Sequence, residues 1–416
     1  MNVKNKMFLV VLIIFSLHKV QAQTTPKTFE HKKNIFTLAF YKQAGQDSMV
    51  DFVDGVYRIL KINKERSKDE ALTKSHFTFI PAVEYSLATK FATSLNANFV
   101  RPSMHKATNN STYSSEIKLT QNKQVISQLV SNIWTKNNNY NINTNWSYLK
   151  YPQKDFGLGS KENSLEKFDQ LDYSYIKLHQ SIVKKIAPNW YLGPGFNIDY
   201  HWNITDTSTM NRPVYGIQEY GLTKHSSSIG WTMNLLYDSR KSIINPLANT
   251  TYLNVIYRNN LRFLGSDFNL QSISLDARKY LPFPLHSKNI LALWSYNVIN
   301  LNGKAPYLDL PYTASDLYLN TGRGYIQGRF RGDKFFFVES EYRFGITENG
   351  FIGGVFFANM QTVTEPKSEQ IHNFKAGYGA GIRIKLNKYS NTNIAIDYGI
   401  GQGGSHGIFM NLGEVF

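Results

Sequence analysis

The stretch that decides the fold runs from Thr321 to Phe416 and opens with Gly322-Arg323-Gly324-Tyr325-Ile326-Gln327-Gly328-Arg329-Phe330-Arg331. Beyond this loop, apolar residues occupy every second position. Between 334 and 344 they alternate with Glu339 and Glu341, and between 375 and 386 they alternate with glycine and Arg383. A period of two places successive side chains on opposite faces of a strand. The pattern predicts two-faced strands, which occur both in soluble sandwiches and in membrane barrels.

The first residues have the features of an export signal. Lys4 and Lys6 precede an apolar stretch at 7–17, and Val20-Gln21-Ala22 forms a small-residue cleavage site. A short membrane anchor is the alternative, but the apolar stretch is too short for about 30 Å of hydrocarbon. We therefore expect residues 1–22 to be a signal peptide.

The composition argues against several kinds of chemistry and binding. Aromatic residues make up 14% of the chain and cysteine is absent, which excludes disulfides and thiol chemistry. Lys and Arg number 46 against 30 Asp and Glu. These basic residues are scattered through turns and loops and form no single stripe, so we expect no nucleic-acid binding. We attribute them to a polar lumen and to contact with outer-membrane lipids, including lipopolysaccharide.

Residues 23–76 differ from the rest and are expected to form a periplasmic extension. Asp47 or Ser48 would cap a helix that ends near Ile62. Its apolar face would be formed by Met49, Phe52, Val53, Val56, Ile59 and Leu60. Two interpretations stay open: the helix lies on the membrane or the barrel mouth, or it binds a partner lipoprotein or periplasmic protein.

From residue 77 to 416, short alternating runs are separated by turn residues, which predicts an all-β fold: a transmembrane antiparallel barrel of about 16 strands. The expected strands are 77–86, 91–100, 112–121, 126–135, 140–151, 171–184, 189–203, 228–238, 250–261, 267–281, 288–301, 333–346, 350–360, 374–387, 391–400 and 407–416. The long connections 152–170, 204–227 and 302–332 would then lie at one end of the barrel, and the short ones at the other.

Several short motifs are concentrated in the second half of the chain. They are Tyr237-Asp238-Ser239-Arg240, Gly265-Ser266-Asp267, Leu275-Asp276-Ala277-Arg278-Lys279-Tyr280, Arg323-Gly324-Tyr325, Gly328-Arg329-Phe330-Arg331, Glu341-Tyr342-Arg343 and the closing Gly407 to Phe416. With these motifs the chain resembles the BamA/TamA superfamily of outer-membrane assembly barrels, also called the bacterial surface antigen family. Because only residues 23–76 precede the first strand, it resembles the branch that lacks periplasmic repeat domains.

The resemblance implies that Arg323, Gly324 and Tyr325 form a lasso loop inside the lumen, with the arginine bound to carboxylates of the wall. A buried guanidinium needs such a partner, and its fork suits a carboxylate. Where the family has Phe-x-Asp-x-Gly, this chain has Phe357-Ala358-Asn359-Met360-Gln361. Asn359 cannot form the ion pair, so Glu339 or Glu341 is expected to replace the missing aspartate.

The resemblance also directs attention to the seam between the first and last strands. Pro81 lacks a ladder donor, and the last strand contains Gly407 and Gly413, so we expect weak pairing there. In the family such a seam is a lateral gate, whereas the plain alternative is a short edge pairing without a gating role. The closing segment with Phe416 also resembles the signal that new barrels present to the barrel assembly machinery.

The sequence indicates no catalytic, metal or cofactor site. Gly403-Gly404-Ser405-His406-Gly407 fits a nucleophile motif, but a strand follows it instead of the required helix. The 10 histidines show no metal-ligand spacing. We expect a non-enzymatic protein of the outer membrane of a Gram-negative bacterium with a role in membrane biogenesis. A passive pore and a membrane scaffold for a periplasmic partner are the competing hypotheses.

Overall fold

The computed structural model describes residues 51–52, 54, 76–103, 108–161, 164–208, 212–368, 370–388 and 391–416. The expected signal peptide lies outside these residues, as does most of the expected helix. Phe52 and Asp54 are helical. Within the described part of the chain, no helix has the length and apolar character needed to cross a membrane.

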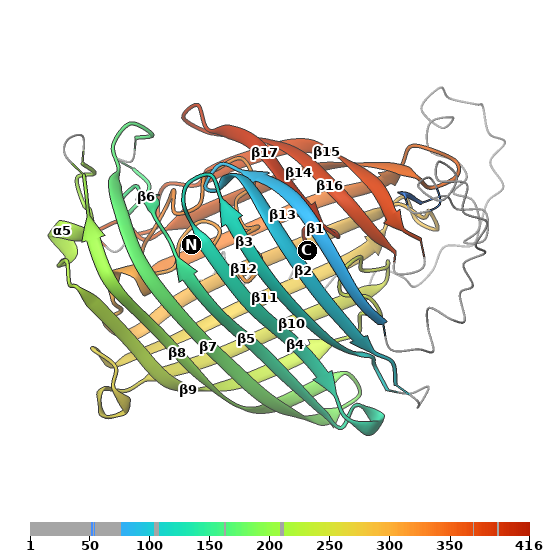
Figure 1. The fold of residues 1–416 in the computed structure, drawn as a ribbon, viewed down its shortest axis with the longest axis horizontal. Helices are drawn as coiled ribbons and strands as arrows, with labels where there is room; N and C mark the ends of the chain where they lie inside the picture. Colours follow the sequence, from blue (N-terminus) through green and yellow to red (C-terminus); the bar gives the residue numbers. More distant parts are fainter. Residues whose placement is uncertain are drawn as a thin grey trace.

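The described chain forms a barrel of antiparallel strands joined by hairpin connections (Figure 1). The strands are β1 (His76–Ser86), β2 (Lys90–Arg101), β3 (Ser111–Thr120), β4 (Val125–Trp134), β5 (Tyr140–Lys150), β6 (Gln153–Asp155), β7 (Asp169–Ala187), β8 (Trp190–Asp206), β9 (His225–Asp238), β10 (Thr250–Asn260), β11 (Leu270–Pro282), β12 (Ile290–Gly303), β13 (Lys334–Gly345), β14 (Ile352–Val363), β15 (Lys375–Asn387), β16 (Thr392–Gly401) and β17 (His406–Leu412). Short helical turns are η2 (Lys136–Asn138), α5 (Ile217–Tyr220), η3 (Arg262–Leu264) and η4 (Tyr307–Asp309).

Each strand of the wall pairs with the next one along the chain. The three-residue strand β6 pairs with β7 alone, while β5 continues the wall by pairing with β7. The long connections 151–168, 207–224 and 304–333 therefore lie at one end, here called the far end. The start of β1 and the end of β17 lie at the other, the entry end. The predicted all-β barrel is confirmed, as is the placement of the three long connections at one end. The short connections are not confined to the entry end, because 87–89, 121–124 and 402–405 turn at the far end.

Turn chemistry accounts for the tight connections at the entry end. Only two residues separate β7 from β8, and Asn189 there has φ +64°. Asparagine tolerates this left-handed backbone because its short side chain can hydrogen-bond locally. A turn this short joins the two longest strands of the wall without a loop that would cover the barrel mouth.

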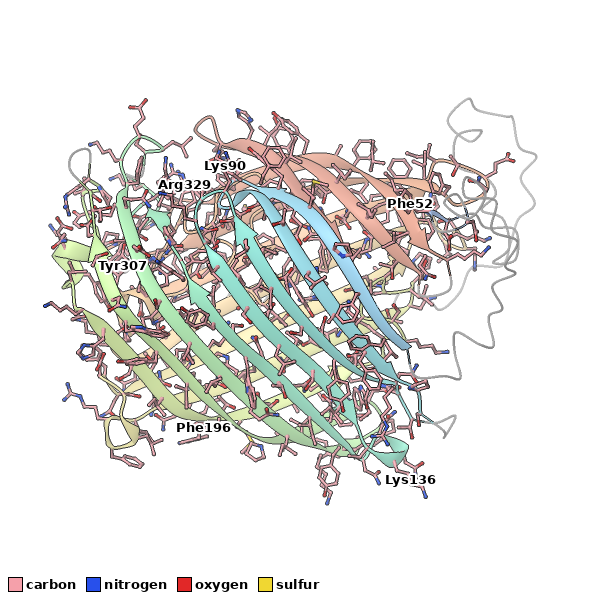
Figure 2. The ribbon with its side chains drawn as sticks, in the orientation of Figure 1. Phe52, Lys90, Lys136, Phe196, Tyr307 and Arg329 are labelled. Atoms are coloured by element: carbon pink, nitrogen blue, oxygen red, sulfur yellow. The ribbon has the colours of Figure 1, made fainter. Side chains whose placement is uncertain are left out.

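The two faces of each strand meet different surroundings. Phe196, Met233 and Tyr378 are exposed on the outer surface, and Phe196 points away from the barrel in Figure 2. Glu339, Glu341, Arg343 and Arg383 are buried on the inner face. An apolar exterior around a polar interior is the arrangement expected of a barrel in lipid.

The core of the molecule lies inside the barrel, where the connection 304–333, here called the lumen loop, packs against the wall. Buried rings from both sides form one cluster, which comprises Tyr280, Trp294, Tyr325, Phe330, Phe335, Phe337 and Phe416. A second cluster near the far end combines Tyr151, Leu171 and Tyr173 of the wall region with Tyr307, Leu308 and Leu310 of the lumen loop. The lumen loop thus fills much of the interior.

The predicted last strand, 407–416, is too long. β17 ends at Leu412, and Gly413 has φ +95°. The chain then turns into the lumen, where Val415 and Phe416 are buried. A glycine permits this turn because it lacks the Cβ that disfavours positive φ in other residues.

Candidate functional site

The Gly-Arg-Gly segment of the lumen loop lies directly against the inner wall. Gly322 has φ +84° and Gly324 has φ +102°. A Cβ added to Gly324 would lie 2.9 Å from the carbonyl oxygen of Ile400, so β16 leaves no room for a side chain there. The two glycines let the backbone press onto the wall, and Arg323 between them enters the polar lumen.

Arg323 is bound by three wall carboxylates. Its Nη2 contacts Glu339 and lies 2.6 Å from Glu341 Oε2, while Nη1 lies 2.6 Å from Asp397 Oδ2. The guanidinium carbon also lies 3.7 Å from the centre of the Phe357 ring. The arginine is 1% exposed, so water contributes little to its solvation and the carboxylates must hold the charge. Both glutamates named from the sequence therefore contact Arg323.

Asn359 supports this arrangement by donating hydrogen bonds. Its Nδ2 lies 2.9 Å from the backbone oxygen of Arg323 and 3.2 Å from Glu339 Oε2. The amide thus fixes the loop backbone and one carboxylate at once. An aspartate at this position could not donate either hydrogen bond.

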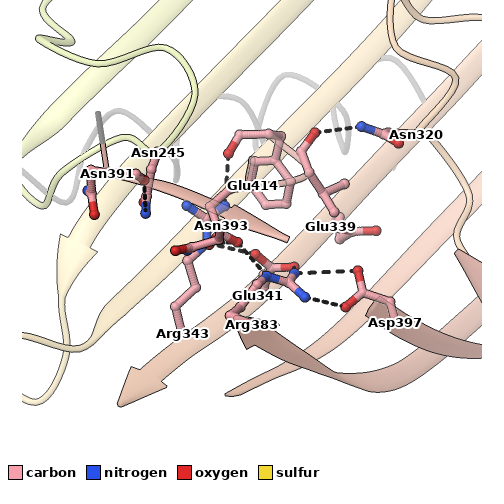
Figure 3. A network of polar contacts seen from close by, with 12 residues as sticks. Asn245, Asn320, Glu339, Glu341, Arg343, Arg383, Asn391, Asn393, Asp397 and Glu414 are labelled. Atoms are coloured by element: carbon pink, nitrogen blue, oxygen red, sulfur yellow. Dashed lines mark hydrogen bonds and ion pairs between the residues drawn. The ribbon is translucent and has the colours of Figure 1, made fainter. Parts of the chain in front are cut away.

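Two further arginines extend the charged cluster towards the entry end (Figure 3). Arg383 Nη1 lies 2.5 Å from Asp397 Oδ1, and its Nε lies 2.7 Å from Glu414 Oε2. Arg343 Nε lies 2.6 Å from Glu341 Oε1. Glu341 and Asp397 are each shared between guanidinium groups, so the cluster joins β13, β15, β16 and the lumen loop.

Tyr325, the third predicted lasso residue, anchors the loop to the far end of the last strands. Its hydroxyl lies 2.5 Å from the backbone oxygen of Ala376 and accepts a hydrogen bond of 2.8 Å from the backbone N–H of Gln402. Its ring packs on Phe330 within the lumen loop. Arg323 and Tyr325 therefore hold the same short segment to the wall at two heights.

A second buried arginine, which the sequence analysis did not select, holds the loop near the far end. Arg331 Nε lies 3.1 Å from Asp155 Oδ1, and Arg331 Nη1 donates to the backbone oxygens of Tyr307 and Leu310. Tyr307 also donates its hydroxyl proton to Asp155. Figure 2 shows Tyr307 and Arg329 towards the end that carries α5. Arg331 stands in the Gly/Arg loop with which the sequence analysis opens, so its basic side chain could have indicated a second buried ion pair.

Asp309, in η4 of the lumen loop, contacts side chains of β8 and β9. Its Oδ2 accepts a hydrogen bond of 2.6 Å from Ser228, and its Oδ1 lies 3.6 Å from His201 Nδ1. Burial, together with the charge of Asp199, raises the pKa of the Asp309 carboxyl above its usual range. The lumen loop is thus attached to β9 as well as to β13, β14 and β16.

The seam is the second element of the site. β1 and β17 lie next to each other, yet they form no ladder among the described residues, whereas every other pair of neighbouring wall strands does. A Cβ added to Gly407 would lie 2.6 Å from Leu87 Cγ, so the β1–β2 turn packs on β17 at the far end. Contact across the seam is therefore made by side chains.

The structure places the other predicted seam residues apart from one another. Pro81 is exposed on β1, where its register partner is Leu95 of β2. Gly413 lies beyond the end of β17. A cavity of about 110 Å³ opens between the β1–β2 turn, the end of β17 and the lumen loop, and its lining includes Leu87, Phe409, Tyr318 and Arg323. The seam and the lumen loop, which are the two elements of the site, both line this cavity.

Within the described residues, no cluster of three or more His, Cys, Asp or Glu side chains is arranged to hold a metal ion. Arg323, Arg331, Arg343 and Arg383 are each bound to at least one carboxylate. The site therefore consists of a polar lumen, in which ion pairs hold the lumen loop to the wall, next to the seam, where the described residues of β1 and β17 form no ladder.

The chain matches one family model, and its fold is similar to those of two solved structures. A family model described as the Omp85 superfamily domain matches residues 59–414. BamA from Haemophilus ducreyi lacking POTRA domains 1–3 superposes with a TM-score of 0.53 at 12% identity, covering 89% of this chain and 83% of that chain. CdiB from Acinetobacter baumannii superposes with a TM-score of 0.54 at 14% identity, covering 82% of this chain and 60% of that chain. At these identities the likeness is one of fold. A search of curated proteins finds no match.

Proposed function

Because the chain belongs to the Omp85 superfamily, we propose that it acts, without enzymatic chemistry, in the biogenesis of the outer membrane of a Gram-negative bacterium. The proposed working part is the seam between β1 and β17. A strand of a client protein, or a lipid, inserts or passes where the barrel closure lacks a ladder.

The observation that carries this proposal is the contrast between the seam and the rest of the wall. β1 is laddered to β2 from His76–Val100 to Ser86–Lys90, but among the residues that the structure describes it has no registered pair with β17. The unpaired edges of such strands are templates for another strand. Separating β1 from β17 therefore breaks fewer hydrogen bonds than separating any other two neighbours.

The lumen favours this role over that of a passive pore. Arg323 and Arg331 bind the lumen loop to carboxylates at two levels, and the rings of Phe330 and Tyr325 pack against each other in the same loop. A loop held by buried ion pairs is expensive to displace. We expect low and intermittent conductance in planar bilayers, and a steady open conductance would favour the pore instead.

The test is a disulfide across the seam, for which the cysteine-free chain offers a clean background. Leu87→Cys with Gly407→Cys places the new Cβ atoms within reach of a bond, because the added Cβ already lies close to Leu87 Cγ. In a strain that depends on the protein, we expect the oxidised pair to reduce growth and to change outer-membrane protein and lipid composition. Reduction of the disulfide should restore both.

A matched control places cysteines at Ala97 and Ser115, which are register partners in the intact β2–β3 ladder. This second disulfide adds the same chemistry away from the seam and should leave growth and composition unchanged. If the seam disulfide forms fully and has no more effect than the control, the seam is not the working part.

A further inference from the structure

The last four residues, 413–416, here called the tail, occupy the lumen instead of extending the wall. Gly413 donates its backbone N–H to the Asn393 oxygen at 2.7 Å, which is the last backbone bond between this segment and β16. Val415 and Phe416 are each 2% exposed. Two apolar residues are thus buried inside a barrel whose inner face is largely polar.

Three separate elements hold the tail backbone, and Figure 3 labels Asn320 and Arg343, which belong to two of them. The N–H of Glu414 donates to the Ile244 oxygen at 2.8 Å, from the connection between β9 and β10. Asn320 Nδ2 of the lumen loop donates to the Val415 oxygen at 2.9 Å, and Arg343 Nη2 of β13 donates to the Phe416 oxygen at 2.8 Å. These elements lie far from β17 in sequence, so the tail connects them to the end of the last strand.

The side chains of the tail fit a matching site. The Phe416 ring stacks on Trp294 with 5.0 Å between ring centres, and the Tyr280 ring lies beside it at 6.4 Å. Glu414 Oε2 lies 2.7 Å from Arg383 Nε, and its Oε1 accepts a hydrogen bond of 2.6 Å from Asn393. Aromatic stacking and a charge-assisted hydrogen bond are specific in geometry, which distinguishes this site from loose filling of space.

The strand that the tail holds is the least supported strand of the wall. β17 lacks a ladder on its β1 side, and its ladder with β16 runs only from the pair Ile394–Leu412 to the pair Ile400–His406. The entry end of β17 is therefore fixed mainly by the tail residues beyond Leu412. Losing the tail contacts would leave the strand held by one short ladder.

We propose that the tail is a latch that keeps β17 beside β1, and that its displacement from the Trp294 site opens the seam. The inference rests on the proposed function, because it assigns a control element to the same seam. It differs from that proposal in its readout, since the latch acts on the purified barrel in the absence of any client protein.

The experiment measures hydrogen exchange of the β17 amides in the purified protein in lipid, because exchange reports the population of the open form. Phe416→Ala removes the ring that stacks on Trp294. Truncating a buried phenylalanine removes enough stabilisation to raise exchange at 406–412 by at least about tenfold. Phe156→Ala is the matched control: Phe156 is also buried, at 1% exposed, but packs on Phe168 in the connection 151–168 at the far end. It should leave β17 exchange within about twofold of the parent.

A second variant ties the effect to the seam. In Phe416→Ala carrying the Leu87→Cys and Gly407→Cys disulfide, exchange at β17 should return towards that of the parent. If Phe416→Ala does not fold, Asn320→Ala removes one tail hydrogen bond and should raise β17 exchange to a smaller extent. Unchanged exchange, an equal rise in Phe156→Ala, or no rescue by the disulfide would overturn the latch. A barrel can fail this test and still lose function when its seam is locked, so the two proposals are separable.

Discussion

The wall from β13 to β16 and the pair formed by β1 and β17 belong to one barrel, but different interactions hold them. In the first region, continuous ladders are reinforced from inside by Arg323 and the carboxylates that surround it. At the seam, Leu87 packs on Gly407 without a ladder. The barrel is therefore stabilised from inside where the lumen loop binds the wall, and it is held more weakly where its first and last strands meet.

The largest effect is expected from Arg323→Ala. The change leaves three carboxylates buried without their shared cation. Breaking a buried ion pair from one side costs about 3–5 kcal/mol, so we expect a loss of this size in the free energy of unfolding. Denaturant unfolding of the barrel in lipid vesicles measures it.

The control for this change is Arg262→Ala, an arginine in the exposed η3 turn. Its removal should alter the unfolding free energy by no more than about 0.5 kcal/mol. Similar losses in the two variants would mean that the lumen cluster adds nothing beyond an ordinary surface charge, and the contrast between the braced wall and the seam would fail.

A smaller effect is expected from Asn359→Asp, which restores the residue type found at this position in the family motif. The aspartate would face the Arg323 carbonyl and the Glu339 carboxylate, both of which now accept hydrogen bonds from the amide. We expect a loss of about 2 kcal/mol, because two acceptors lose their donor and a negative charge is placed beside the Glu339 carboxylate. Asn359→Ala, which removes the donor without adding charge, should lose about 1 kcal/mol. A more stable Asn359→Asp would mean that the aspartate binds Arg323 directly.

The smallest effect is expected near the seam, from Glu84→Gln. Glu84 Oε2 of β1 lies 2.6 Å from Lys118 Nζ, but the side chains are 26% and 17% exposed. An ion pair in contact with water contributes about 0–1 kcal/mol, and salt reduces it further. Unfolding at low and high salt measures this contribution. A loss as large as that of Arg323→Ala would show that the first strands are braced as firmly as the last ones.

The strands were predicted by a period of two, which is visible along the chain. Arg323 was selected because the Arg323-Gly324-Tyr325 motif resembles that of the family, and Glu339 and Glu341 were selected as carboxylates on the next strand that could replace the aspartate of the family motif. Asp397 was not found: it is 74 positions from Arg323, and only the order of β13 to β16 around the barrel brings it close. The pairing of Arg331 with Asp155 spans 176 positions and was missed for the same reason.

The sequence by itself determined the two-faced strands, the placement of long connections at one end, and the presence of an arginine that needs a carboxylate. These properties depend on side chains a few positions apart. The tertiary structure alone decided which carboxylates surround that arginine, the absence of a ladder at the seam, and the course of the tail into the lumen. The physical reason is closure: the curvature and register of the whole barrel fix which distant groups meet, and no short segment contains that information.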